Sequence, residues 1–186
     1  MLLWVLGTAL AGTVVIDAKV PVDLKQGGRS VLQTWGPVVA SLPDIDAGPQ
    51  VYEIVRGDKS VTTTVDVPPT GSVTLTIEAA RAVSMPSGDP PPDAPKVDLH
   101  AEPGFRFALV LDGQRAFAFG SDQAVRLERL AVGEHRLELR TADLVTIYNR
   151  GTLEVRPGDQ LTLLVAQGRA LDVLGRDGAW TAGGDR

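Results

Sequence analysis

The chain of 186 residues lacks cysteine altogether, has only two histidines, and is poor in aromatic residues, at 5%. Without cysteine the chain forms no disulfide, has no thiol nucleophile, no cysteine-rich zinc site and no lipid-modified cysteine. No run of about 18 or more apolar residues occurs, which excludes a conventional membrane-spanning helix. We therefore expect no integral membrane span.

An excess of positive charge is also lacking. The chain carries 18 Lys and Arg against 23 Asp and Glu, a net charge of −5, and neither half is basic. Nucleic acid and anionic membrane surfaces are bound through clustered positive side chains. We therefore expect no nucleic-acid partner.

The N-terminal residues are apolar, and no charge appears before Asp17. Ala9-Leu10-Ala11 has the small-x-small spacing of a signal-peptidase site, which would cut before Gly12, although a basic n-region is missing. We predict an export signal over residues 1–11, and hence a periplasmic or cell-surface location. The alternative is that residues 2–16 form a first buried strand or helix.

A proline-rich segment divides the chain. Residues 85–95 contain five prolines in eleven positions, and proline removes a ladder donor and fixes φ. This composition predicts an extended spacer, which we place at residues 81–96. A long surface loop inside one domain is the alternative.

The segments on either side of the spacer resemble each other. Residues 42–48 align with residues 127–133 at an offset of 85, and residues 73–77 align with residues 161–165 at an offset of 88. The two segments have apolar residues at the same alternating positions and turns at the same places, but few identical residues. This combination is typical of an old duplication. The change of offset predicts a turn three residues longer in the second copy.

Period-2 alternation of apolar residues recurs between turn residues, for example at residues 105–111, 135–140 and 152–156. The pattern predicts an all-β fold of two tandem small β-sandwich domains, of Greek-key type, joined by the proline-rich linker. Each domain would have six or seven strands. The boundaries we predict are residues 12–80 for the first domain, 97–168 for the second and 169–186 for a C-terminal tail.

The second copy resembles a PEGA domain over about residues 97–166. The resemblance lies in Ala101-Glu102-Pro103-Gly104-Phe105, Leu111-Asp112-Gly113 and the run from Leu130 to Leu137. The sequence departs from the family pattern at residues 119–122, and the first copy is more distant. The resemblance implies a small, often exported bacterial β-sandwich that serves as a non-catalytic envelope module, with no catalytic residues to transfer.

Motifs for catalysis are missing from the sequence. There is no Gly-x-Ser-x-Gly, no P-loop, no dinucleotide-binding glycine motif and no acidic calcium loop. His135 lies on the same face of its predicted strand as Leu137 and Leu139. We therefore expect its side chain at the rim of the core, where it makes a structural hydrogen bond. We expect no catalytic residue, no metal site and no cofactor.

Aromatic residues are the remaining candidates for binding. Trp35 precedes Gly36-Pro37, Trp180 lies in a glycine-rich tail, and Phe117 and Phe119 lie two apart on one predicted strand. Core packing is the alternative for the two phenylalanines. Trp180 either folds back onto the domain or contacts a partner, and the sequence does not decide between them.

These observations favour a non-catalytic exported module that contacts a protein partner or an envelope component. Pairing of an exposed strand edge with an extended partner segment is the expected mechanism. The alternative is a carbohydrate-binding module whose exposed aromatic rings stack on sugars.

Overall fold

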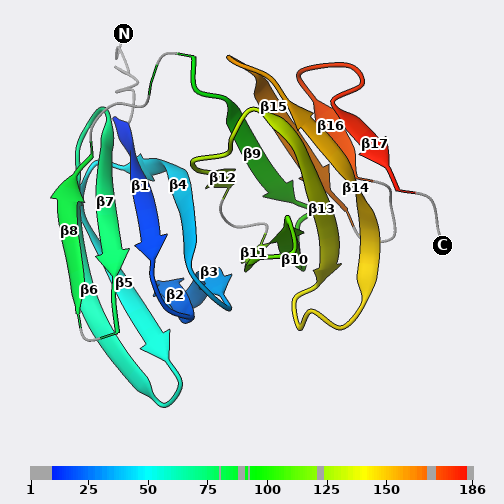
Figure 1. Ribbon diagram of the computed structural model, residues 1–186. Coiled ribbons are helices and arrows are strands. Elements are labelled where there is room, and N and C mark those ends of the chain that lie inside the picture. Colours follow the sequence, from blue (N-terminus) through cyan, green and yellow to red (C-terminus); the bar gives the residue numbers. More distant parts are fainter. Residues whose placement is uncertain are drawn as a thin grey trace, which may run out of the picture.

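The computed structural model describes residues 10–79, 81–87, 91, 93–120, 124–166 and 171–183, and within these ranges all regular structure is β-strand (Figure 1). The first half contains β1 (Ala11–Ala18), β2 (Val22–Gln26), β3 (Arg29–Thr34), β4 (Val38–Asp46), β5 (Gly48–Arg56), β6 (Lys59–Val67), β7 (Ser72–Ile77) and β8 (Ala82–Pro86). The second half contains β9 (Lys96–Ala101), β10 (Arg106–Leu111), β11 (Arg115–Gly120), β12 (Val125–Leu127), β13 (Gly133–Thr141), β14 (Ile147–Val155), β15 (Gln160–Val165), β16 (Asp172–Leu174) and β17 (Trp180–Ala182).

The strands form two sheets. One has eight strands in the order β16-β15-β9-β12-β4-β1-β7-β8, and the other has nine in the order β17-β14-β13-β10-β11-β3-β2-β5-β6. The sheets enclose one hydrophobic core that contains residues of both halves. Alternation explains each strand: in β15, Leu161, Leu163 and Val165 are buried while the residues between them are not. The predicted all-β, sandwich-like fold is confirmed.

The two halves are structural repeats. Each strand from β1 to β8 has its counterpart eight strands later, and in both sheets the order reads the same from either end, with β17 as the one extra strand. Gly48 opens β5 and Gly133 opens β13, 85 residues apart, whereas Lys59 opens β6 and Ile147 opens β14, 88 apart. The β5–β6 connection is residues 57–58 and the β13–β14 connection is residues 142–146, which confirms the turn three residues longer.

Backbone conformation repeats as well. Asp44 and Arg129, 85 positions apart, both adopt a positive φ, of 58° and 54°. Asp44 lies at the irregularity of the β1–β4 ladder, between Leu42 and Ile45, and Arg129 lies between β12 and β13. Non-glycine residues rarely adopt this conformation. Its recurrence 85 positions apart shows that the two repeats share this backbone conformation.

The expectation of two separate sandwiches is not confirmed, because both sheets run through both halves. β4 pairs with β12 in the eight-stranded sheet, and β3 pairs with β11 in the nine-stranded sheet. Figure 1 shows the first repeat, blue to green, on the left and the second, green to red, on the right. Alternation in a sequence indicates which face of a strand is buried, but not which strand lies beside it. The pairing of strands from different repeats therefore could not be predicted from the alternation.

The predicted spacer and tail also contain strands. β8 occupies residues 82–86 of the predicted linker and pairs with β7 at the edge of the sheet. Pro86 ends this strand, a position where an edge strand tolerates proline. In the tail, β16 pairs with β15 and β17 pairs with β14. The first repeat thus extends beyond residue 80 and the second beyond residue 168.

At the N-terminal end, β1 lies between β4 and β7. The predicted signal-peptidase cut before Gly12 falls inside this strand, and the Ala47 amide donates to the Leu10 carbonyl oxygen. The rest of the predicted signal, residues 1–9, lies outside the described residues. Within the described part of the chain, no helix is long and apolar enough to cross a membrane.

Candidate functional site

The four candidate aromatic residues do not form one surface. Phe117 and Phe119 are 1% and 0% exposed in the core, as the packing alternative predicts. Trp35 is half-buried directly after β3, and Trp180 is half-buried in β17. Four strands of the sheet lie between β17 and β3, so the two tryptophans belong to different regions.

Trp180 folds back onto its own chain. It pairs with Leu153 of β14 and packs against the core. A Cβ built on Gly151 would lie 2.7 Å from the Trp180 ring and closer still to the Thr181 carbonyl oxygen, and both approaches are closer than van der Waals contact allows. Gly151 therefore makes room for this ring, and β17 is a strand of the sheet.

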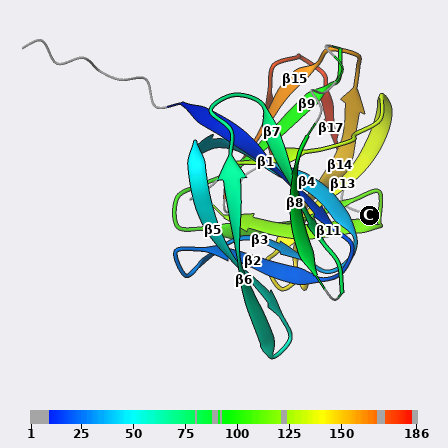
Figure 2. The same cartoon turned by 90° about the vertical axis from the view of Figure 1, so that its left-hand side faces the viewer.

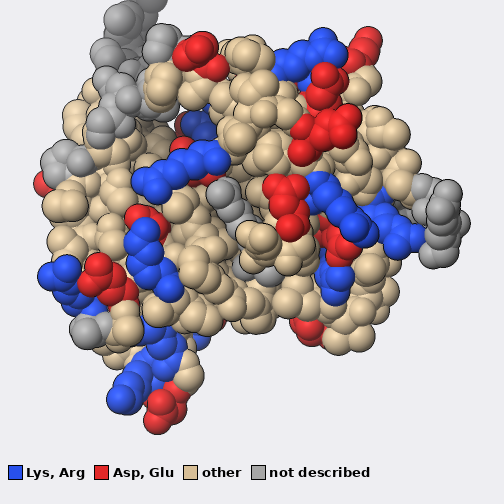
Figure 3. Space-filling model, in the orientation of Figure 1, with Lys and Arg blue, Asp and Glu red and all other residues tan. Residues whose placement is uncertain are grey.

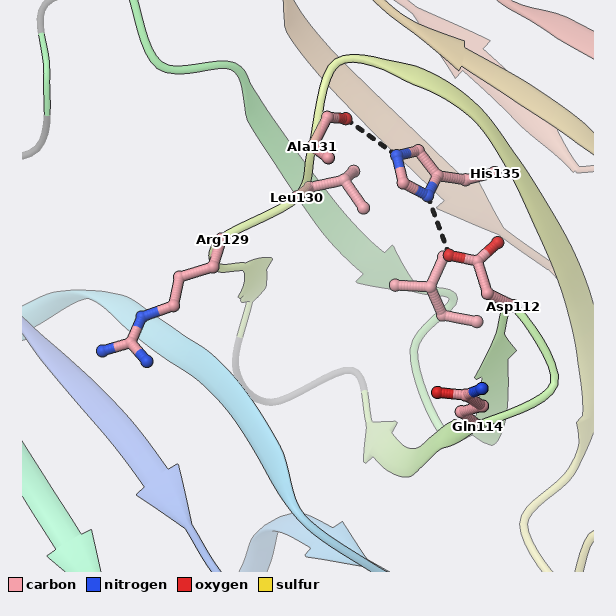
Figure 4. A pocket seen from close by; sticks show the side chains of 7 residues that line it. Asp112, Gln114, Arg129, Leu130, Ala131 and His135 are labelled. Atoms are coloured by element: carbon pink, nitrogen blue, oxygen red, sulfur yellow. Dashed lines mark hydrogen bonds and ion pairs between the residues drawn. The ribbon is translucent and has the colours of Figure 1, made fainter.

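A pocket of about 220 Å³ lies beside His135 (Figure 4). The His135 Nδ1 lies 2.9 Å from Asp112 Oδ2, and its Nε2 lies 2.8 Å from the Ala131 carbonyl oxygen. Asp112 Oδ1 also accepts a hydrogen bond from the Arg136 amide, at 2.8 Å. Arg129 points away from this pair in Figure 4. The Asp112 carboxylate and the Ala131 carbonyl are both acceptors, so each can bind an N–H of the His135 ring.

The first repeat shows what this histidine does. Gln50 is the counterpart of His135, and its Nε2 donates to the Asp46 carbonyl oxygen at 3.0 Å, just as His135 bonds to Ala131. Its Oε1 accepts from Gln26 Nε2 at 2.9 Å. His135 is 8% exposed, so the predicted structural hydrogen bond at the core rim is confirmed. Among the described residues, no three His, Asp or Glu side chains gather in a group that could hold a metal ion.

Polar contacts also cross the junction of the repeats. Arg106 Nη2 donates to Ser30 Oγ at 2.6 Å, and the Ser30 hydroxyl donates to Asp23. Burial lowers the pKa of Arg106, while the nearby Asp23 carboxylate raises it. Arg126 donates to both Asp98 oxygens, at 2.6 and 2.9 Å, and this hydrogen bonding raises the pKa of Arg126. The Arg106–Ser30 bond joins the two repeats, whereas Arg126 and Asp98 both belong to the second repeat and fix β12 against β9 beside the junction.

The outer surface carries no field of one sign on the face that Figure 3 shows, where positive and negative side chains are interspersed. Among the ion pairs of the chain, Arg140 with Glu138 is half-buried, whereas Arg156 with Glu154 is exposed. Exposed pairs of this kind contribute little to stability or binding. Charge therefore does not mark a binding site on this face.

The sheet edges differ strongly from one another. The eight-stranded sheet ends in β16, of three residues, and in β8, of five residues with a terminal proline. The nine-stranded sheet ends in β17, of three residues, and in β6, of nine. β6 is thus the long edge of the molecule. The β5–β6 hairpin extends beyond the rest of the first repeat in both Figures 1 and 2.

The β5–β6 ladder shows which groups of β6 face outward. The register is regular from Gly48↔Val67 to Arg56↔Lys59 around the two-residue turn, so Arg56 and Lys59 form a hydrogen-bonded pair. Bonded and non-bonded pairs then alternate, and Pro49, which has no N–H, falls on a non-bonded pair opposite Asp66. The even-numbered residues of β6 therefore direct their N–H and C=O groups away from β5. These residues are Ser60, Thr62, Thr64 and Asp66.

Side chains leave this edge open. Ser60, Thr62 and Thr64 are exposed, and Val61 is 50% exposed. The strand contains no proline and no bulge, and its charges lie near its ends, at Lys59 and Asp66. Natural proteins protect sheet edges with charges, prolines, bulges or short strands. β6 has little of this protection.

The counterpart of β6 in the second repeat is β14, and its edge is covered. β17 pairs with β14, with the Glu154 amide donating to the Ala179 carbonyl at 2.8 Å and the Gly183 amide donating to the Arg150 carbonyl at 2.7 Å. Arg150 and Glu154 are the counterparts of Thr62 and Asp66. In β14, the N–H and C=O groups at these positions bind an added antiparallel strand. The equivalent N–H and C=O groups of β6 face outward.

Sequence reasoning expected an exposed edge but did not locate it on β6. The Val-Thr-Thr-Thr run at residues 61–64 was the available signal, since β-branched residues without charge favour a strand. No protein-family model matches the chain, and no curated protein matches it either.

Proposed function

We propose that this protein is a non-catalytic binding module that holds a protein partner by pairing β6 with an extended segment of that partner. The observation that carries the proposal is the regular, nine-residue edge of β6, whose outward groups match those that bind β17 in the other repeat. Addition of a strand to a sheet edge gives affinity through main-chain hydrogen bonds. The even-numbered residues of β6 supply those bonds.

Chain order explains why no strand among the described residues pairs with the outer edge of β6. In the second repeat the chain after β16 turns back and forms β17 on β14. In the first repeat the chain after β8 continues instead to β9 at Lys96, in the other half of the molecule. The position beside β6 that corresponds to β17 is therefore left for a strand from elsewhere.

The wider role follows the sequence resemblance. We propose that the two repeats are PEGA-like units and that the protein acts in the periplasm or at the cell surface. The all-β, two-sheet fold is compatible with such units, and the apolar N-terminal residues support export. The carbohydrate-binding alternative gains no support from the site, because Phe117 and Phe119 are buried and Trp35 and Trp180 lie apart.

A displayed library of extended peptides, selected on the intact protein, tests the edge. Thr64→Pro removes an outward N–H of β6 while leaving the β5–β6 ladder its bonds, so it should abolish peptide capture. Ser84→Pro is the matched control. The Ser87 amide and the Arg81 carbonyl bond to β7, so Ser84 directs its N–H outward from β8.

We expect wild type and the Ser84→Pro variant to select the same peptides, with exchange of the Thr62 and Thr64 amides slowed on binding. Peptides that bind the Thr64→Pro variant equally well would place the binding surface elsewhere. Circular dichroism of both variants checks that the sheets are intact.

A further inference from the structure

The two repeats of this chain already associate by edge pairing of equivalent strands. β4 pairs antiparallel with its counterpart β12, and β3 pairs antiparallel with its counterpart β11. In each sheet one residue faces its own counterpart 85 positions on, Ser41↔Arg126 in one and Gln33↔Ala118 in the other. These pairs define a local two-fold axis through both sheets. Edge-to-edge association about a two-fold axis is thus a mode that this fold adopts.

We propose that the strand bound by β6 is β6 of a second copy of this chain, in antiparallel register about a two-fold axis. This inference rests on the proposed function and names its partner. An interface of this kind is isologous, because each copy contributes the same strand. It would join two nine-stranded sheets into one.

The strand is complementary to itself. A two-fold axis perpendicular to the sheet keeps even-numbered residues opposite even-numbered ones, so the outward N–H and C=O groups of both copies meet. The register that uses all nine residues places Thr63 opposite Thr63. It also places Thr62 opposite Thr64 and Ser60 opposite Asp66, where a hydroxyl faces a carboxylate. Lys59 lies opposite Val67, so no like charges face each other.

Side-chain packing favours the same register. Val61, half-exposed at the end of the hairpin, lies opposite Val65 of the second copy, whose side chain is already buried in its own chain, so the gain is the covering of Val61. Pairs of β-branched residues directly opposite each other stabilise a sheet. The dimer would therefore cover an apolar side chain that the single chain leaves in water.

β17 of another copy does not fit this place. Its Trp180 ring requires the glycine at position 151, where a Cβ would come within 2.7 Å of the ring. The counterpart of Gly151 in β6 is Thr63, which has a branched side chain on that face. Both the Trp180 ring and the Thr181 carbonyl oxygen lie too close to position 151 for a side chain there, so β17 in its observed position does not match Thr63.

Sedimentation velocity of the full chain across a concentration series measures the dimer directly. We expect a concentration-dependent dimer for wild type and for the Ser84→Pro control. In Thr64→Pro the dimer should weaken by about 30-fold, since each copy loses one interchain N–H bond. A dimer unaffected by Thr64→Pro would overturn the proposal.

Cysteine cross-linking reports the register, and the chain has no cysteine of its own to interfere. In the full register the Cβ atoms at position 63 are about 4.5–5.5 Å apart, close enough for a disulfide. Thr63→Cys should therefore oxidise to a covalent dimer much faster than the control Ser84→Cys. Equal rates would overturn the register and with it the proposal.

The two proposals fail in different ways. A wild type that stays monomeric at every concentration, yet captures peptides in a manner sensitive to Thr64→Pro, would overturn the second copy as partner and leave the edge function standing. A dimer with the expected cross-link supports both.

Discussion

Ser41 faces Arg126 across the junction of the two repeats, and each residue is the counterpart of the other. Both also bond across the sheet: the Ser41 hydroxyl donates to Glu128 at 2.6 Å, and Arg126 binds Asp98. Ser41 is fully buried, so its contact with Glu128 lies within the joined sheet. At the junction of the two repeats, the paired strands β4 and β12 are therefore also joined by polar side chains; we call this junction the seam.

Arg106 also makes hydrogen bonds across the junction of the two repeats, and its removal should destabilise the fold. In Arg106→Met the bonds to Ser30 are lost, and Asp23 keeps the Ser30 hydroxyl and its ion pair with Lys25. We expect a loss of about 1–3 kcal/mol in the free energy of unfolding, measured in urea. The exposed pair of Arg81 with Glu78 is the control, and Arg81→Met should cost less than about 0.5 kcal/mol. Equal losses in the two variants would contradict a role for Arg106 in joining the repeats.

Tyr52 is fully buried, and within the described part of the chain its hydroxyl has no hydrogen-bond partner. Its counterpart in the second repeat is Leu137, which is apolar. Tyr52→Phe removes an unsatisfied polar group and should raise the free energy of unfolding by about 1 kcal/mol at pH 7. A lower stability of the variant in thermal or urea unfolding would show that the hydroxyl is bonded.

Tyr52 should also lower the free energy of unfolding at high pH. Burial raises the pKa of Tyr52 from 10.0 to about 12. Above pH 10 the unfolded chain ionises this phenol while the folded chain keeps its proton, so stability falls as the pH rises toward 12. We expect the melting temperature of wild type to fall more steeply over pH 10–12 than that of Tyr52→Phe. Parallel curves for the two proteins would refute this assignment.

Gly151 should be the residue that admits β17. In Gly151→Ala the added Cβ meets the Trp180 ring, so β17 should leave the sheet and the Glu154 and Gly183 amides should lose protection from hydrogen exchange. Gly36→Ala is the control, because a Cβ there meets nothing within 4 Å. Protection that survives Gly151→Ala would contradict this role, since both the Trp180 ring and the Thr181 carbonyl oxygen would have to move while β17 stays paired.

Glutamine, the residue at the equivalent position 50 of the first repeat, should be able to replace His135. His135→Gln retains an Nε2 donor for the Ala131 carbonyl, as Gln50 has for Asp46, and should cost less than about 1 kcal/mol. His135→Ala loses both hydrogen bonds and should cost about 2 kcal/mol. Urea unfolding of the two variants measures the difference. If glutamine proves as damaging as alanine, the imidazole has a role that the repeat does not share.

Local features of this fold could be predicted from the sequence. The alternation at residues 105–111 and 135–140 gave strands whose buried faces are those seen in β10 and β13. The offsets of 85 and 88 located the repeat and its longer turn. These features could be predicted because side-chain parity and turn residues act over a few positions.

Features that depend on distant neighbours could not be predicted in this way. β8 and β17 are short strands whose form depends on β7 and β14 beside them. The alternating charges around Arg126 are typical of a solvated face, yet Arg126 lies in the seam of the sheet. The free edge of β6 is likewise a property of strand order, because the second repeat contains an equivalent strand that is covered.

The pairing of β3 with β11 and of β4 with β12 has a thermodynamic meaning of its own. Between separate molecules such a contact would dissociate on dilution, but the covalent tether between β8 and β9 supplies an effective local concentration in the millimolar range. Proteolysis of that tether would convert an intramolecular equilibrium into a bimolecular one. The nicked halves would then obey mass action, and dilution alone would separate them.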